Sequence, residues 1–405
     1  MPEAVIVSAT RSPIGRANKG SLKDMRPDDL SAAMIQAALD KIPELDPKDI
    51  DDLYLGCGLP GGEMGFNMGR IVAVLMGYDH LPGATITRYC SSSVQTTRMA
   101  FHAIKAGEGD VFVSAGVETV SRFRKGTSDH LPDTQNPLFD EAKARTEEQA
   151  KGGQDWHDPR QEGKLPDAYI AMGQTAENVA KMRGLTRREL DEFGVRSQNL
   201  AEKAIADGFW ANEITPVTLP DGTVVTTDDG PRAGVTLEAV EQLDPVFRPD
   251  GVVTAGNCCA LNDGAAAVIV MSDTKAKALG LTPLARIVST GVTGLSPEIM
   301  GLGPVEASKQ ALARANMTID DIDLVEINEA FAAQVVPSYQ DLGIDIDKLN
   351  VNGGAIAVGH PFGMTGARLQ NTMINSLKTH DKQTGLITMC VGGGQGMALV
   401  LERMS

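Results

Sequence analysis

The stretch Ala84-Thr-Ile-Thr-Arg-Tyr-Cys90-Ser-Ser-Ser-Val94 joins a short β-type run to a helical pattern. Residues then recur at helical spacing, at Val94, Thr97, Phe101 and Ile104. Serine is common at helix starts, so Cys90 is expected where a strand gives way to a helix. The unpaired N–H groups there carry partial positive charge, which predicts a lowered pKa for the thiol and a nucleophilic role. A free cysteine that only fills the core is the alternative.

The composition describes a globular, acidic protein. Its 405 residues exceed one ordinary core, so two or three domains are expected. The net charge of −16 argues against nucleic-acid and anionic-membrane partners, since both need a basic face. No apolar run reaches the roughly 18 residues of a membrane span. The N-terminus enters a strand at once, so we expect no signal or transit peptide.

Five cysteines stand at positions 57, 90, 258, 259 and 390, and none forms a CxxC pair. An odd count with this spacing argues against a disulfide framework and against a zinc site. We therefore expect a reducing, cytoplasmic location and no bound metal.

Short apolar runs alternate with helical patterns, which predicts a mostly parallel, doubly wound α/β sheet. A helix is expected to begin at Asp28 or Asp29, and others to cover 174–183 and 186–207, the last opened by the capping box Thr186-Arg-Arg-Glu189. Between 123 and about 168 the chain is polar, with several prolines and little periodicity. That pattern predicts an irregular excursion over the surface.

The early pattern returns after Leu281. Ile6-Val-Ser-Ala9 is echoed by Ile287-Val-Ser-Thr290, and residues 46–55 are echoed by 318–327. The separations agree closely: 328 − 57 = 271 for Cys57 and Asn328, and 360 − 90 = 270 for Cys90 and His360. Two similar offsets predict a duplicated α/β unit. Its first half would comprise 1–122 and 251–273, its second half 274–405, and 123–250 would be an insertion into the first.

Three stretches of the second half lie at ends of predicted strands, where open α/β sheets bind their ligands. They are Glu326–Ala332, Asn350–Arg368 and Thr388–Gly396. The duplication sets His360 opposite Cys90, an arrangement that can activate a thiolate. Cys390 precedes glycines whose bare backbone can approach a ligand, and Asn328 can position a water or an oxyanion. Each residue also has a purely structural interpretation, and it is their convergence that favours chemistry.

The second-half motifs resemble those of the thiolase family. They are Asn328-Glu-Ala-Phe-Ala332, residues 350–368 and Cys390-Val-Gly-Gly-Gly-Gln-Gly396, and the resemblance extends from Val5 to Glu402. The resemblance implies an α/β fold of two duplicated βαβαβαββ halves, with central helices between two mixed sheets. It also implies that the inserted loop domain covers coenzyme A (CoA).

The resemblance implies a role for each candidate residue. Cys90 would be the acylated nucleophile, His360 its activating partner and Cys390 the general acid and base. One oxyanion hole would combine His360 with a water held by Asn328. The other would consist of the backbone N–H groups of Cys90 and Gly392.

The implied activity is that of an acyltransferase that cleaves 3-ketoacyl-CoA with CoA, in lipid metabolism such as fatty-acid β-oxidation. CoA would be a co-substrate, with no permanently bound cofactor, and the assembly a homodimer or a tetramer. Arg232 matches a family CoA contact, and Cys259 stands where the family often has a CoA-contacting serine. Further substrate or CoA contacts are expected at Ala255, Met172, Phe247 and Phe331.

The sequence departs from the family at Ser91-Ser-Ser93, where Ser-Gly is usual, and at Ala115-Gly-Val-Glu-Thr-Val-Ser121. Short-chain biosynthetic thiolases carry a histidine where this chain has Ala171, and the smaller side chain favours a medium or bulky 3-ketoacyl group. The alternatives are a biosynthetic acetyl-CoA C-acetyltransferase restricted to acetoacetyl-CoA, a ketoacyl-synthase-like condensing enzyme, and a non-catalytic acyl-CoA or sterol carrier of the same fold.

Overall fold

The computed structural model describes residues 2–125 and 134–405. Its main sheet has ten strands, in the order β10-β11-β12-β9-β1-β8-β5-β3-β4, with β2 paired to β8 at the side. The first half contributes β1 (Ala4–Arg11), β2 (Gly15–Arg16), β3 (Asp52–Cys57), β4 (Gly83–Ile86), β5 (Val111–Thr119) and β8 (Asn262–Ser272). The second half contributes β9 (Ala285–Gly294), β10 (Leu324–Ile327), β11 (Thr384–Val391) and β12 (Gln395–Arg403). A separate hairpin joins β6 (Val217–Thr218) to β7 (Val224–Val225).

The helices follow the same division. The first half has α1 (Pro27–Asp40), α2 (Met68–Leu75) and α3 (Ser92–Ala106), and the chain between β5 and β8 has α4 (Asp140–Gln149), α5 (Met172–Arg183), α6 (Arg187–Ala206) and α7 (Leu237–Val240). The second half follows α8 (Asp273–Ala278) with α9 (Gly303–Ala315), α10 (Ala332–Leu342), α11 (Ala355–Val358) and α12 (Thr365–Thr379).

Both halves repeat one strand order, which confirms the duplication. In the first half, β3 lies parallel between β4 and β5. In the second half, β10 lies parallel to β11 on one side, and on its other side Val325 forms a parallel bridge with Leu349. The next strands run antiparallel in both halves, β8 between β5 and β1, and β12 between β11 and β9.

The expectation of a mostly parallel sheet is wrong, because β8 and β12 are antiparallel to both neighbours. β12 follows β11 through a tight turn in which Gly393 and Gly394 have positive φ, so its direction must reverse. The two expected mixed sheets are also not separate. β1 and β9 join them edge to edge through the register pairs Val5–Arg286 and Ile6–Ala285.

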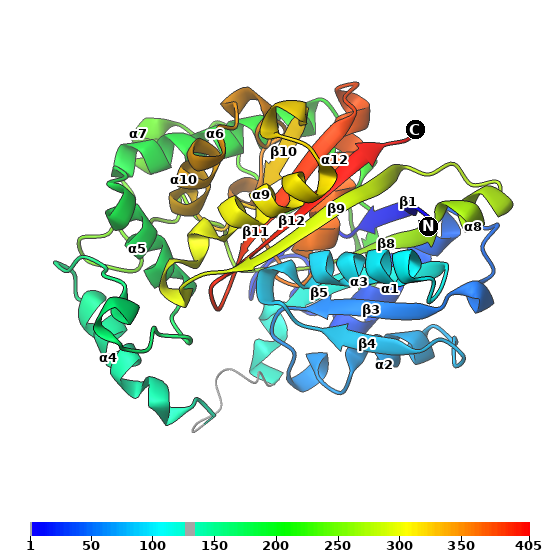
Figure 1. Ribbon diagram of the computed structural model, residues 1–405, viewed down its shortest axis with the longest axis horizontal. Coiled ribbons are helices and arrows are strands. Elements are labelled where there is room, and N and C mark those ends of the chain that lie inside the picture. The colour runs from blue at the N-terminus through cyan, green and yellow to red at the C-terminus, as the bar shows by residue number, and fades with distance from the viewer. Residues whose placement is uncertain (1, 126–133) are drawn as a thin grey trace.

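Two central helices lie between the halves of the sheet (Figure 1). α12 packs on β1 and β8 of the first half and on β10 and β11 of the second, while α3 packs on β3 and β5. The two helices contact each other, and Gln370 Nε2 donates to Thr97 Oγ1 at 2.9 Å. α1 and α2 cover the outer face of the first half, and α9 and α10 cover that of the second. Cys90 lies in the core formed around the central helices.

Between the two central helices the repeat has an offset of 273 residues, which is larger than the 270 and 271 residues that the sequence indicated. Thr97 and Gln370 are 273 residues apart and face each other in helices of equal length. Only Ser91 separates Cys90 from α3, whereas Pro361–Met364 separate His360 from α12. The two residues therefore lie in equivalent connections but not at equivalent positions, because loops accept extra residues that helices do not.

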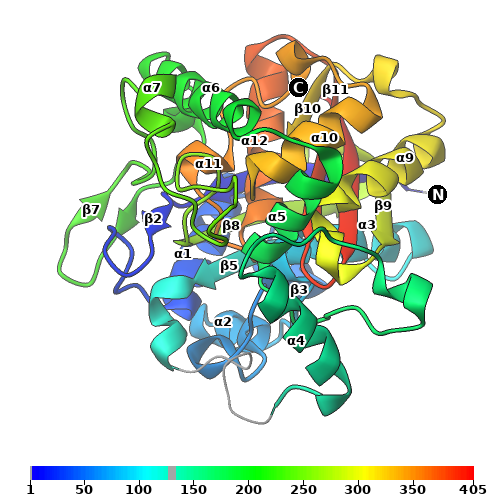
Figure 2. The same cartoon turned by 90° about the vertical axis from the view of Figure 1, so that its left-hand side faces the viewer.

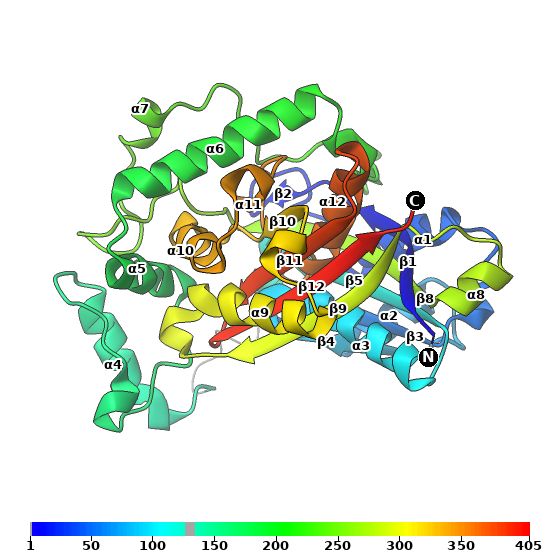
Figure 3. The same ribbon diagram turned by 45° about the horizontal axis from the view of Figure 1, so that its top comes forward.

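The chain between β5 and β8 packs on the second half. α6 crosses over α10 and α11, and α5 contacts α10 (Figures 2 and 3). The predicted helices and the capping box of Thr186 with Glu189 are confirmed. α4 was not expected; it buries only Ala142 and Thr146, too few residues to show periodicity in the sequence. Residues 126–133 of the predicted excursion lie outside the described residues.

The start of α1 also differs from the expectation. Arg26 is the N-cap residue and Pro27 occupies the first helical position, so Asp28 and Asp29 lie in the first turn instead of capping it. Among residues 2–125 and 134–405, no helix is long and apolar enough to span a membrane.

Candidate active site

Cys90 lies in a 3₁₀ turn, Tyr89–Ser91, directly before α3, and it is 7% exposed. Tyr89 has a φ of 43°, a left-handed conformation that is strained for a bulky residue and that marks the approach to the cysteine. The predicted lowered pKa is wrong for the resting site. Burial raises the pKa of the Cys90 thiol to about 12; the backbone N–H of Gly392 opposes the rise, and Glu118 adds to it. The partial positive charge at the start of α3 does not offset the cost of removing the thiolate from water.

His360 is 1% exposed, and its two ring nitrogens have distinct partners. Nδ1 lies 2.7 Å from Thr365 Oγ1, which donates its own hydrogen to Pro361 O at 2.7 Å. The hydroxyl has only one hydrogen, so Nδ1 must be the protonated nitrogen. Nε2 then carries the lone pair and lies 3.3 Å from Asn328 Nδ2. Burial, aided by Arg368, lowers the pKa of His360 to about 3, so the imidazole is neutral.

Asn328 follows β10 and is 1% exposed. Its side-chain nitrogen faces His360, and of the residues that the structure describes none donates a hydrogen bond to its Oδ1. A buried acceptor of this kind needs a partner, and a water or substrate group can supply it. The resemblance implied a water on this amide, and the geometry is compatible with that role.

Cys390 lies near the end of β11 and is completely buried. Its sulfur is 3.2 Å from the side-chain amide of Gln334. Burial raises the pKa of Cys390, and Cys90 lies close enough to raise it further. Cys259 is within the same electrostatic range of Cys90 and Cys390, and its backbone N–H donates to Ala330 O at 3.1 Å. The fold thus brings these three thiols within electrostatic range of one another.

Comparison with known proteins identifies relatives that match over nearly the whole chain. Residues 4–274 match the family model "Thiolase, N-terminal domain", and residues 281–403 match "Thiolase, C-terminal domain". The chain belongs to the thiolase family. It is 43% identical to a 3-ketoacyl-CoA thiolase of Idiomarina loihiensis, with 100% of both chains covered. It is 41% identical to a 3-ketoacyl-CoA thiolase of Bacillus subtilis, covering 99% of this chain and 100% of the relative.

A solved structure is similar as well. The acetyl-CoA acetyltransferase of Bacillus anthracis superposes with a TM-score of 0.85 at 38% identity, covering 100% of this chain and 99% of that one. The thiolase fold implied by the motifs is therefore confirmed.

Glu118 is a residue of this thiolase site that the sequence analysis did not single out. Its fully buried carboxylate accepts N–H bonds from Gly58 at 2.7 Å and Leu59 at 3.3 Å, and from Gly363 at 2.8 Å. Gly363 belongs to the connection that carries His360, so one side chain ties the loops of both halves together. Burial raises the pKa of Glu118 to about 7, although the backbone donors oppose the rise. The sequence feature that could have identified Glu118 is an acidic residue within a strand that is otherwise apolar and buried.

Three expected substrate contacts, Met172, Phe247 and Phe331, belong to one apolar cluster of this thiolase. The rings of Phe247 and Phe331 pack edge to face at 6.1 Å. A Cβ added at Gly392 would lie 3.6 Å from Met172 Sδ and 3.3 Å from the ring of Tyr89. Arg232 and Ala255 are instead exposed on loops, and the backbone N–H of Arg232 donates to Gln198 Oε1 at 3.0 Å.

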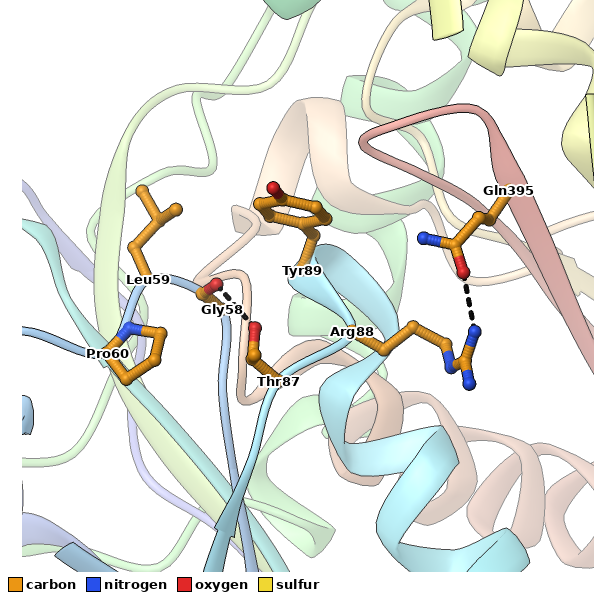
Figure 4. A pocket seen from close by; sticks show the side chains of 7 residues that line it. All are labelled: Gly58, Leu59, Pro60, Thr87, Arg88, Tyr89 and Gln395. Atoms are coloured by element: carbon orange, nitrogen blue, oxygen red, sulfur yellow. Dashed lines mark hydrogen bonds between the residues drawn. The ribbon is translucent and has the colours of Figure 1, made fainter. Parts of the chain in front are cut away.

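A cavity of about 360 Å³ opens beside the turn that carries Cys90 (Figure 4). The Tyr89 ring stands between Leu59 and Pro60 on one side and Gln395 on the other. Arg88 Nη1 donates to Gln395 Oε1 at 2.5 Å, and Thr87 Oγ1 donates to the backbone oxygen of Gly58 at 2.9 Å. Within the described parts of the chain, no cluster of three or more His, Cys, Asp or Glu could hold a metal ion.

Proposed function

We propose that this thiolase transfers the acyl group of a 3-ketoacyl-CoA to CoA, through an acyl-enzyme on Cys90. The observation that carries the proposal is the resting state of the site. A neutral Cys90 thiol, a second thiol at Cys390 within its electrostatic range, and an unprotonated Nε2 on His360 are all buried. The full-length similarity to two 3-ketoacyl-CoA thiolases supports the substrate class.

The first half of the reaction forms the acyl-enzyme. Cys90 attacks the 3-keto carbon, and its proton passes to Nε2 of His360, the nitrogen that the Thr365 hydrogen bond leaves unprotonated. The C2–C3 bond then breaks, and its electrons leave as the enolate of acetyl-CoA. Nε2–H and a water on Asn328 stabilise the enolate oxygen, and Cys390 gives its proton to the enolate carbon.

The second half releases the acyl group. The Cys390 thiolate takes the proton of an incoming CoA thiol, whose sulfur attacks the thioester carbon. The negative charge that develops on the thioester oxygen is held by the backbone N–H groups of Cys90 and Gly392, which are already directed toward the Cys90 sulfur. Collapse breaks the bond to Cys90 and releases the acyl-CoA, and the departing Cys90 thiolate takes back the proton held on Nε2 of His360, which restores the neutral thiol and imidazole of the resting site.

The direct test is CoA-dependent loss of the 3-ketoacyl-CoA enolate absorbance. Cys90→Ser should lower the rate more than about 10³-fold, because the nucleophile is removed. A chain that binds acyl-CoA but shows no turnover would instead be the non-catalytic carrier. A chain active only on acyl-carrier-protein substrates would be the condensing enzyme.

For the acyl group we propose a medium or bulky chain. Ala171, the N-cap residue of α5, is exposed and small, so the side chain next to Met172 fills less of the proposed pocket than a histidine would. Each methylene buried there can contribute up to about 0.8 kcal/mol of binding. The packed Phe247–Phe331 pair and the likeness to an acetyl-CoA acetyltransferase favour the second candidate, a biosynthetic enzyme restricted to acetoacetyl-CoA. The kcat/KM for C4, C8, C12 and C16 substrates separates them, since a steady fall from C4 would support the second.

We further propose that CoA lies beneath the 123–250 insertion near Arg232, and that the enzyme is a cytoplasmic homodimer or dimer of dimers. β4 is a half-buried strand at the edge of the sheet, and its outer side is covered in part by the Asn67 side chain, which bonds Gly83 O and Thr85 N, so a second copy would associate through the surface beside it. Exposed apolar side chains accompany it, at Phe66, Ile71, Val74 and Leu75. Light scattering of wild type and of Phe66→Asp, which places a charge on this exposed apolar surface, tests the association. A monomeric wild type would contradict it.

A further inference from the structure

Gln334 contacts two parts of the proposed catalytic machinery. It lies in the first turn of α10 and is completely buried. One atom of its side-chain amide is 3.0 Å from the backbone oxygen of Asn328, and that same atom is 3.2 Å from the Cys390 sulfur. The other atom is 3.1 Å from the backbone N–H of Val335.

These contacts decide which atom is nitrogen. The backbone oxygen of Asn328 can only accept a hydrogen bond, and the N–H of Val335 can only donate one. The amide therefore satisfies both neighbours in one orientation, with Nε2 facing Asn328 and Cys390 and with Oε1 facing Val335. Nε2 carries two hydrogens, so one can serve the Asn328 oxygen and the other can point to the Cys390 sulfur.

The close packing around Gln334 holds it in place. Gly301 faces it so closely that an added Cβ would lie 2.8 Å from the Gln334 Cβ. Because the Gln334 nitrogen is a donor, the Cys390 thiol cannot direct its own hydrogen there. The hydrogen remains available to a substrate, and the thiolate left after proton transfer keeps an N–H donor in an otherwise desolvating core.

We propose that Gln334 is a positioning residue for the proton-transfer steps, with its amide N–H supporting the Cys390 thiolate while the same nitrogen anchors the backbone of Asn328. The proposal rests on the acid–base role of Cys390 within the proposed function. It adds a residue that connects Cys390 to the Asn328–His360 pair, so that proton transfer and enolate stabilisation depend on one buried amide.

The test separates the two cysteine chemistries. Exchange of the acetyl-CoA methyl protons with D₂O reports on Cys390, and alkylation by iodoacetamide reports on Cys90. Gln334→Leu should slow the exchange by about 10- to 100-fold, the usual effect of losing one hydrogen bond to a charged group. Its pH profile should move to higher pH, while Cys90 alkylation stays within about twofold.

Gln334→Glu keeps the volume of the side chain but places a carboxyl beside the sulfur, so its pH profile should move at least as far. This variant also keeps the test valid if the leucine variant fails to fold. Asn178→Leu is the control, because it deletes another fully buried amide, one that donates to Glu298 O and accepts from Arg248, outside the contact between the central helices. It should lower Tm without moving the pH profile of the exchange.

Unchanged exchange in both Gln334 variants would overturn the inference, as would equal losses of exchange and alkylation together with a lower Tm. Cys390→Ala separates this from the proposed function. If it retains exchange, the acid–base role of Cys390 itself is wrong. If it loses exchange while the Gln334 variants retain it, only the inference about Gln334 is wrong.

Discussion

The contact between the central helices should set the distance between the catalytic loops, and Gly366→Ala tests this directly. Gly366 lies in the first turn of α12 and faces α3. A Cβ at this position would lie 2.4 Å from Val94 N, 2.7 Å from Val94 Cγ2 and 2.9 Å from Ser93 C. Ordinary contacts of a Cβ begin near 3.4 Å, so the two helix starts must separate by about 1 Å.

The expected magnitude follows from this displacement. Overpacking of a close contact costs about 1–3 kcal/mol, which should lower Tm by several degrees. The helix starts carry Cys90 and His360, and a misplacement of about 1 Å can reduce catalysis by roughly 100-fold. We therefore expect kcat to fall far more than stability alone would explain. Thiolysis kinetics and thermal unfolding on the same preparation measure both effects.

Gly294→Ala is the matched control. A Cβ there would meet only Gly394 O, at 3.8 Å, and the backbone is not in the left-handed region. This variant should keep wild-type kcat and Tm. If Gly366→Ala retained more than half of the wild-type kcat, the spacing of the helices would not control the site, and the reasoning would be refuted.

Three further outcomes are expected. Cys390→Ser should reduce thiolysis by roughly 10²–10⁴-fold with little change in Tm, because a hydroxyl cannot ionise near neutrality; near-normal turnover would return Cys390 to a packing role. The rate of Cys90 labelling by iodoacetamide, followed by peptide mapping, should rise about tenfold per pH unit from pH 7 to 9. No plateau is expected, because burial raises the pKa of the thiol to about 12. Earlier labelling of Cys258 or Cys259 with activity intact would contradict the assignment. The pKa of Glu118 in the native state, about 7, lies above its value in the unfolded state. The native state therefore binds more protons than the unfolded state between about pH 4.5 and 7. As pH rises through that window, the contribution of Glu118 to the free energy of unfolding declines. Denaturant unfolding of wild type and Glu118→Gln should therefore differ in pH slope, and parallel slopes would show that the carboxyl is already ionised.

The sequence by itself determined the features that depend on local pattern. Repeated segments revealed the duplication, and the capping box of Thr186 and Glu189 marked the start of α6. Predicted strand ends near Cys90, Asn328 and Cys390, and the repeat that pairs Cys90 with His360, indicated one shared site, because a duplicated sheet brings such segments together. These signals need only neighbours along the chain, so they can be read without coordinates.

The tertiary structure decided what depends on burial and on contacts between distant segments. The helix start predicted a lowered pKa for Cys90, but burial dominates and raises it, because desolvation reflects the whole fold. The direction of β8 could not be predicted, since a long insertion separates it from β5. The roles of Glu118 and Gln334 could not be assigned from the sequence, because they depend on bonds to Gly363 and Cys390, residues remote in sequence. Only packing brings a carboxylate or an amide of this kind to the one place where its hydrogen bonds matter.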